Sequence, residues 1–117
     1  MEYNVKRFCK AGERNVNGFI FDKESTDMAL KNYINKPVIL VKKDESYLGG
    51  IKETDKVVGY MTGYDDEHIK CFLYEGFIED GFNPDEYKSL LEIDTLHISE
   101  NNICITNKIL KIVIAKK

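Results

Sequence analysis

The chain has 117 residues, of which 43% are hydrophobic and 32% are charged, and this predicts one soluble domain with a modest core. No apolar run approaches the roughly 20 residues that a membrane helix needs, and residues 1–10 lack the apolar segment of a secretory signal, so we expect a cytoplasmic protein that does not span a membrane. The formal net charge of -3, from 17 basic and 20 acidic residues, argues against binding to nucleic acid.

The first part of the chain predicts two short strands and a helix. Residues 2–10 alternate weakly between apolar and polar side chains, and residues 18–21 form a short apolar run after a loop that contains several turn formers. Between residues 25 and 35 apolar side chains recur at three- and four-residue spacings, which is typical of one face of an amphipathic helix. Pro37 ends this helix, because proline removes an amide and disfavours helical geometry at the residue before it.

The apolar run Pro37–Val41 is predicted to be a strand inside the sheet. It has no polar face to offer to water, so both of its faces should be covered. A surface loop at residues 44–55 follows it. Residues 57–64 and 68–75 then predict an antiparallel hairpin, and Gly59 and Gly63 in its first arm indicate a bulge or a close approach of two backbones.

A second helix is predicted to begin at Asn83-Pro84-Asp85-Glu86. This run combines an N-cap side chain, a proline at the first helical position and two early acids, all of which favour a helix start. The buried face of this helix is expected to consist of Tyr87, Leu90 and Leu91.

The remaining apolar runs predict three more strands, at residues 96–98, 103–106 and 109–115, with turns at residues 99–102 and at Asn107. The whole order is β, β, α, β, β, β, α, β, β, β. It predicts a single α+β domain over residues 1–117, with a small mixed or antiparallel β-sheet or a partly open barrel, and two α-helices.

Motifs that would reveal a cofactor are absent from the sequence, which has no Gly-rich phosphate loop, His-Glu-x-x-His helix or Cys-x-x-Cys pair, so we predict no cofactor. Cys9, Cys71 and Cys104 are odd in number and far apart. We interpret them as core or near-core thiols, with a three-cysteine metal site as the alternative. His68 and His97 lack a neighbouring ligand at metal spacing and are interpreted as exposed or satisfied strand residues.

Two further groups of polar or aromatic residues are interpreted as structural. The three acids at residues 65–67 are expected to be solvated at the hairpin tip, although carboxylates of this kind also suit a hard cation. No basic stripe accompanies the tyrosines, so they are expected to pack on the sheet and not to stack on bases. These tyrosines are Tyr47, Tyr60, Tyr64 and Tyr74.

Four short segments follow one another in about the first two-thirds of the chain: residues 14–21 (RNVNGFIF), 29–33 (ALKNY), 36–41 (KPVILV) and 58–60 (VGY). Together they resemble the prohead maturation proteases of tailed phages, and residues 109–115 resemble the closing region of that fold. The resemblance implies a catalytic histidine after the strand at residues 38–41, with a serine nucleophile and an acidic partner elsewhere, because a serine hydroxyl needs a neighbouring base to become nucleophilic.

Lys42 and Lys43 stand where the resemblance would place that histidine. A lysine beside another lysine and Asp44 is expected to be solvated, whereas a Ser-Lys dyad needs a desolvated lysine. The resemblance therefore implies a phage or prophage protein of the bacterial cytoplasm that keeps the protease core but is catalytically silent. Its role would be capsid assembly or protein binding, through self-association or another phage protein.

Lys42, Lys43, Asp44 and Tyr47 are the candidate interaction residues, and a homodimer is also expected because edge strands of a small sheet invite pairing. Two alternatives stay open. The first is an active serine hydrolase or protease with an unconventional site at Ser99, assisted by His97 or Lys42. The second is a phage or host regulatory binding module that is unrelated to capsids.

Overall fold

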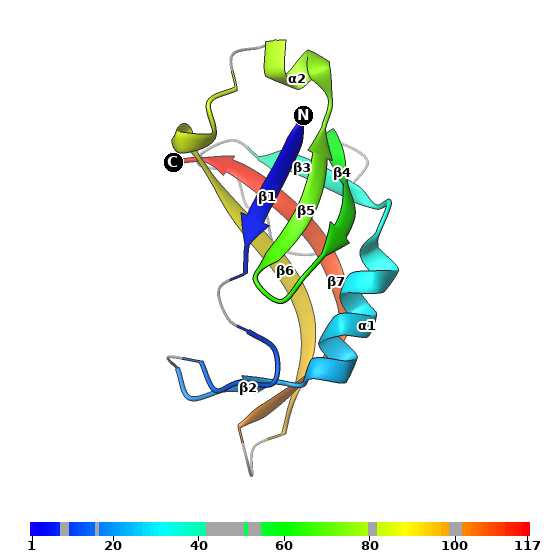
Figure 1. The fold of residues 1–117 in the computed structure, drawn as a ribbon, viewed down its shortest axis with the longest axis vertical. Helices are drawn as coiled ribbons and strands as arrows, with labels where there is room; N and C mark the ends of the chain where they lie inside the picture. The colour runs from blue at the N-terminus through cyan, green and yellow to red at the C-terminus, as the bar shows by residue number, and fades with distance from the viewer. Residues whose placement is uncertain (8–9, 16, 42–50, 52–54, 80–81, 99–101) are drawn as a thin grey trace.

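The computed structural model describes residues 1–7, 10–15, 17–41, 51, 55–79, 82–98 and 102–117 (Figure 1). In these residues, seven strands form one mixed sheet that is curled into a half-barrel, with two helices. This confirms the predicted α+β class. No helix in the described ranges is long and apolar enough to cross a membrane.

The sheet has the order β1-β5-β4-β3-β7-β2, and β6 pairs with the opposite edge of β7. The strands are β1 (Glu2–Lys6), β2 (Ile20–Phe21), β3 (Pro37–Val41), β4 (Lys56–Tyr64), β5 (His68–Leu73), β6 (Tyr87–Ile98) and β7 (Ile103–Lys116). The helices are α1 (Lys23–Tyr33) and α2 (Glu75–Glu79), and a 3-10 turn, η1, covers Pro84–Glu86. Only the pairs β3–β7 and β2–β7 are parallel among the described strands.

The helix α1 packs against the sheet through the apolar face that its sequence predicts. Asp22 caps its start, where a carboxylate oxygen accepts a hydrogen bond of 2.9 Å from the Ser25 amide. Its buried side chains include Leu30 and Tyr33. The start of the helix also supplies a hydrogen-bond acceptor to β7, at a position between the segments that pair with β2 and β3. There the Thr106 amide donates to Ser25 Oγ at 3.0 Å.

The strand β3 lies between β4 and β7, as the Pro37–Val41 run predicts. Val38 faces the main core, inside the curled sheet, and is fully buried. Ile39 and Val41 belong to a second buried cluster with Val113 of β7. Both faces of the strand are therefore covered, which accounts for its unbroken apolar sequence.

The hairpin of β4 and β5 is also confirmed. Its register shifts between Met61 and Gly63, which is the predicted irregularity. Gly59 lies where the two backbones come close, because a Cβ atom there would overlap the carbonyl oxygen of Phe72. Ile69 on β5 is buried in the core.

The prediction of a helix after residues 83–86 is wrong. Asn83 does cap a turn, since its side chain accepts a hydrogen bond of 3.1 Å from the Asp85 amide, but only η1 follows. From Tyr87 onward the chain is the strand β6, which pairs with β7 along its whole length. That long ladder satisfies many backbone groups at once and outweighs the local preference for a helix. The second helix of the fold is instead α2, immediately after β5.

The predicted strands at residues 103–106 and 109–115 form one strand, β7, so the predicted turn at Asn107 is wrong as well. Asn107 lies where the β6–β7 register shifts between Asp94 and Thr95. Its side-chain amide donates to Asp94 Oδ2 at 2.8 Å. Asparagine thus accompanies a bulge here, which interrupts pairing without reversing the chain.

Candidate binding cleft

Most of the predicted site residues lie outside the described part of the chain. These are Ser99, Lys42, Lys43, Asp44 and Tyr47. For His97 the structure describes the backbone, which belongs to β6 and lies opposite Cys104. The arrangement predicted for a Ser99 hydrolase, and the interaction surface predicted at residues 42–47, therefore stay predictions.

The acids of the hairpin tip are exposed, as predicted, and two of them also interact with their own chain. Hydrogen bonds from the Glu67 and His68 amides to Asp65 lower the pKa of its carboxyl group. Asp66 lies 3.5 Å from the ammonium of Lys23. Within the described ranges, no group of three or more His, Cys, Asp or Glu side chains is arranged to hold a metal ion.

The two described cysteines, Cys71 and Cys104, are buried, which confirms them as core thiols. Burial raises the pKa of the Cys71 thiol to about 12, because the apolar surroundings disfavour its thiolate. Such a thiol is a poor nucleophile at neutral pH. Cys9 lies outside the described residues.

A cleft runs between β1 and β6, the two outermost strands of the curled sheet. No backbone pairing joins these strands in the described structure. They are linked by side chains, because the Tyr3 hydroxyl and Ser89 Oγ share a hydrogen bond of 2.9 Å. The half-barrel is therefore open along this side. The Tyr3–Ser89 hydrogen bond crosses the opening and is called the polar bridge below.

Aromatic rings fill the end of the cleft above this bridge. Phe82 lies at the centre of the group, with its ring centroid 4.8 Å from Phe77, 4.9 Å from Tyr87 and 5.7 Å from Tyr3. Phe77 comes from α2 and is buried. The chain after β5 thus closes one end of the half-barrel. The opposite end of the cleft, where Arg7 lies, holds no such group of rings among the described residues and is called the open end below.

Below the bridge the cleft widens into a cavity of about 310 Å³, at the lower end of the roughly 300–1,000 Å³ found for ligand pockets. Leu30 of α1 and Ile69 of β5 line it and are fully buried in the core. Val5 belongs to its β1 wall, and Leu91 and Ile93 belong to its β6 wall. Among the described residues that line it, most are apolar and none is Asp or Glu.

Both margins of the cleft carry backbone groups that are not used within the sheet. Reciprocal bonds between Met1 and Leu73, and a bond from the Arg7 amide to Glu67, show that the odd-numbered residues of β1 bond to β5. Because bonding alternates along a strand, the amides and carbonyls of Asn4 and Lys6 point toward the cleft.

The same alternation holds on the β6 side. The Lys117 amide donates to the Glu86 carbonyl at 2.9 Å, in register with the β6–β7 pairing, so the even-numbered residues at the start of β6 bond to β7. The backbone groups of Ser89 and Leu91 therefore point away from β7, toward the cleft.

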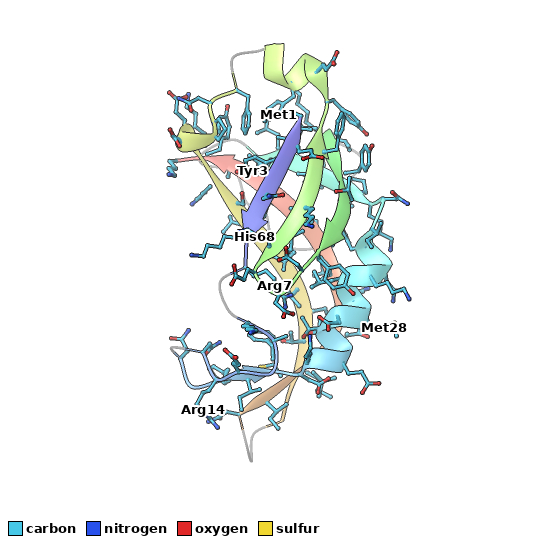
Figure 2. All side chains as sticks on the ribbon, in the orientation of Figure 1. Met1, Tyr3, Arg7, Arg14, Met28 and His68 are labelled. Atoms are coloured by element: carbon cyan, nitrogen blue, oxygen red, sulfur yellow. The ribbon has the colours of Figure 1, made fainter. Side chains whose placement is uncertain are left out.

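Two cationic side chains, Lys6 and Arg7, belong to the lining at the open end of the cleft. Arg7 follows Tyr3 and Val5 on the inward side of β1, and Figure 2 shows it just beyond the end of that strand. Its guanidinium donates to the Asp65 carbonyl oxygen at 2.9 Å. In the described structure neither Arg7 nor Lys6 forms an ion pair with a carboxylate. The mouth of the cleft thus combines positive charge with an apolar interior.

No family model, curated protein or solved structure matches this chain. The resemblance to prohead proteases accordingly stays a prediction.

Sequence reasoning missed the cleft because its two walls are far apart in the chain. Val5 and Leu91 line the same cavity but belong to strands whose neighbourhood depends on the whole sheet order. One local indication was present: Arg7 continues the inward positions of Tyr3 and Val5, and a charged residue at an inward position is unusual for a structural strand.

Proposed function

We propose that this chain is a binding domain for a protein partner, and that the partner occupies the cleft between β1 and β6. The observation that carries the proposal is an apolar cavity of about 310 Å³ whose two margins are strand edges without a pairing partner in the described structure. Unpaired edges are templates for association, and proteins commonly use them for recognition. A role in assembly or protein binding agrees with this arrangement, and capsid assembly is the setting that the prohead protease resemblance implies.

The serine hydrolase alternative rests on Ser99, His97 and Lys42, and no geometry of the described chain adds support to it. Its chemical test is independent of the cleft. A fluorophosphonate probe labels an activated serine, and we expect no label on Ser99 if the chain acts by binding.

Site-specific photo-cross-linking tests the proposed function. A photoreactive amino acid replaces Ile93, which lines the cleft, or Leu96, which lies on the same strand but is 66% exposed and does not line the cavity. We expect the variant at position 93 to form one discrete protein adduct in the cells that make the chain. An adduct of twice the chain mass would identify the partner as a second copy. If position 93 gives no adduct, or the same adducts as position 96, the cleft is not a protein-binding site.

A further inference from the structure

We propose that the cleft binds by strand addition: an extended segment of the partner lies between β1 and β6, with apolar side chains at alternate positions and an acidic residue beside Arg7. This inference rests on the proposed function, since it specifies how a protein partner would occupy the same cleft. It assigns a chemistry to the partner that the proposed function leaves open.

The first support is the backbone. Asn4 and Lys6 on one margin, and Ser89 and Leu91 on the other, direct amides and carbonyls into the gap. Paired strands lie about 4.8 Å apart. β1 and β6 are not paired with each other, and the contact between them is made by the side chain of Tyr3, which reaches across to Ser89. A strand in this gap would supply partners to both margins and would close the half-barrel, which removes both free edges.

The second support is the direction of the strands. The pairings from β1 through β5, β4, β3 and β7 to β6 make β1 and β6 run the same way, as Figure 1 shows. One added segment is therefore antiparallel to both neighbours or parallel to both. We infer the antiparallel arrangement, because it pairs slightly more strongly per residue and its hydrogen bonds lie perpendicular to the strands.

The third support is the match between the cavity and an alternating sequence. A strand presents every second side chain to one face, so two apolar residues separated by one position would enter the cavity above Leu30 and Ile69. The intervening side chains would face outward, on the side of Lys6. The aromatic group around Phe82 limits the segment at the upper end. Below the bridge at Tyr3 the segment would lie beside residues 4–7, so about four or five of its own residues fit there at roughly 3.3 Å per residue.

The fourth support is charge. Arg7 lies at the open end on the inward side of β1, and its guanidinium has no carboxylate partner in the described structure. An antiparallel segment begins at that end, so its acidic residue is N-terminal to the apolar ones. The predicted pattern is acidic, any residue, apolar, any residue, apolar, with all three specified side chains facing the cleft. A guanidinium suits a carboxylate because it offers several donors in a planar fork.

The experiment uses the full chain, labelled with ¹⁵N, and a synthetic peptide with the core Glu-Thr-Val-Thr-Leu flanked by serines. In NMR spectra of the labelled chain, we expect the peptide to shift the amide signals of Asn4, Lys6, Ser89 and Leu91, or to give separate free and bound signals in slow exchange. Hydrogen exchange at these four amides should slow at least tenfold. The amide of Val5, which already bonds within the sheet, serves as the internal reference and should change little.

Three matched peptides and three protein variants separate the contributions. N-methylation of the two backbone amides that face β1 should abolish protection, because it removes donors while keeping every side chain. Exchanging the valine with the threonine that follows it gives the core Glu-Thr-Thr-Val-Leu. This exchange breaks the alternation of apolar residues and should weaken binding by about tenfold or more. Replacing glutamate by lysine should do the same.

On the protein side, Arg7→Glu should weaken binding of the peptide by about tenfold or more. Lys31→Glu makes the same change in net charge on the exposed surface of α1 and should leave binding within twofold. Arg7→Lys keeps the positive charge and should lie between the wild type and Arg7→Glu.

The outcomes distinguish the two proposals. If the N-methylated peptide binds as well as the parent, or the four amides stay unprotected, strand addition is wrong. Decanoate, an apolar small molecule, is the probe for a small-molecule site. If decanoate binds in the cavity while every peptide fails to bind, the cleft is such a site, and strand addition is again wrong. If peptides fail but position 93 still cross-links to a protein, the proposed function stands and the mode of binding proposed here falls.

Discussion

The hydroxyl of Tyr3 and Oγ of Ser89 lie 2.9 Å apart, and this hydrogen bond connects the two outer strands of the sheet across 86 positions of the sequence. It stands between the aromatic group at one end of the cleft and the cavity at the other. The bond is partly buried, so its loss should affect both the stability of the fold and the width of the cleft.

We expect Tyr3→Phe and Ser89→Ala each to lower the free energy of unfolding by about 0.5–1.5 kcal/mol. The double variant should cost less than the sum of the two, because either substitution alone removes the shared bond. Urea unfolding of the four proteins measures the coupling. Additivity of the two losses to within about 0.3 kcal/mol would show that the bond contributes nothing to stability.

Two glycines of β4 provide a matched pair. Gly59→Ala should destabilise the protein by about 1–3 kcal/mol or more, because the new methyl group would overlap the Phe72 carbonyl and meet Leu73. Gly63→Ala should change stability by about 0.5 kcal/mol at most, since no heavy atom lies within 4 Å of the position of its Cβ. Thermal unfolding of both variants decides the matter. Equal losses would mean that the close approach at Gly59 relaxes freely.

The cap at Asp22 makes a specific prediction about acid. The Ser25 amide lowers the pKa of the Asp22 carboxyl below its ordinary value of 3.8. The folded pKa lies below the unfolded one, so the stabilisation is complete above 3.8 and is lost as the pH falls through the lowered folded value. Asp22→Ala should cost about 0.5–2 kcal/mol at neutral pH.

Asp22→Asn keeps an oxygen acceptor but cannot titrate, so it is the control for this charge effect. Urea unfolding from neutral pH to below 3.8 should show the wild type losing more stability than Asp22→Asn at the acid end. Parallel profiles for the two proteins would exclude a charged cap at this position.

The Cys71 thiol should resist alkylation in the folded protein, because it is 2% exposed and burial raises its pKa to about 12. Iodoacetamide labelling followed by peptide mass spectrometry should detect modification of Cys71 after unfolding in guanidinium and little before. Rapid labelling under native conditions would show that the core opens around β5.

Burial at Cys71 also predicts a loss of stability in alkali. The folded pKa is raised above the ordinary value of 9.0, so the neutral thiol stabilises the fold below 9.0 and this contribution is lost as the pH rises toward about 12. Tyr33 acts in the same direction, because burial raises its pKa from 10.0 to about 12. Unfolding measured across this interval should show a steady decline, and a flat profile would contradict both shifts.

Local sequence patterns predicted those elements whose neighbours are close in the chain. The helix α1, the strand β3 and the β4–β5 hairpin follow from apolar spacing, from Pro37 and from the acids of the turn. Each of these signals is local, because a cap or a turn is formed by residues a few positions apart.

The strand β6 could not be predicted in this way. Its residues Tyr87, Leu90 and Leu91 have helical spacing, yet Leu91 packs against the core cluster and Leu90 packs against the cluster on the other face of the sheet. A strand with apolar residues on both faces loses the simple alternation that identifies strands. The cap at Asn83 then favoured a helix that pairing with β7 replaces.

The position of β7 in the sheet bears on the order of events during synthesis. β7 follows every other element along the chain, yet it pairs with β2, β3 and β6. On the ribosome, β3 therefore emerges long before residues 112–115, which form its parallel partner, and Ile39 and Val41 have no Val113 to pack against. The nascent chain thus exposes the apolar strand β3 until β7 has been synthesised, so its yield in the cell should depend on chaperones that hold extended apolar segments.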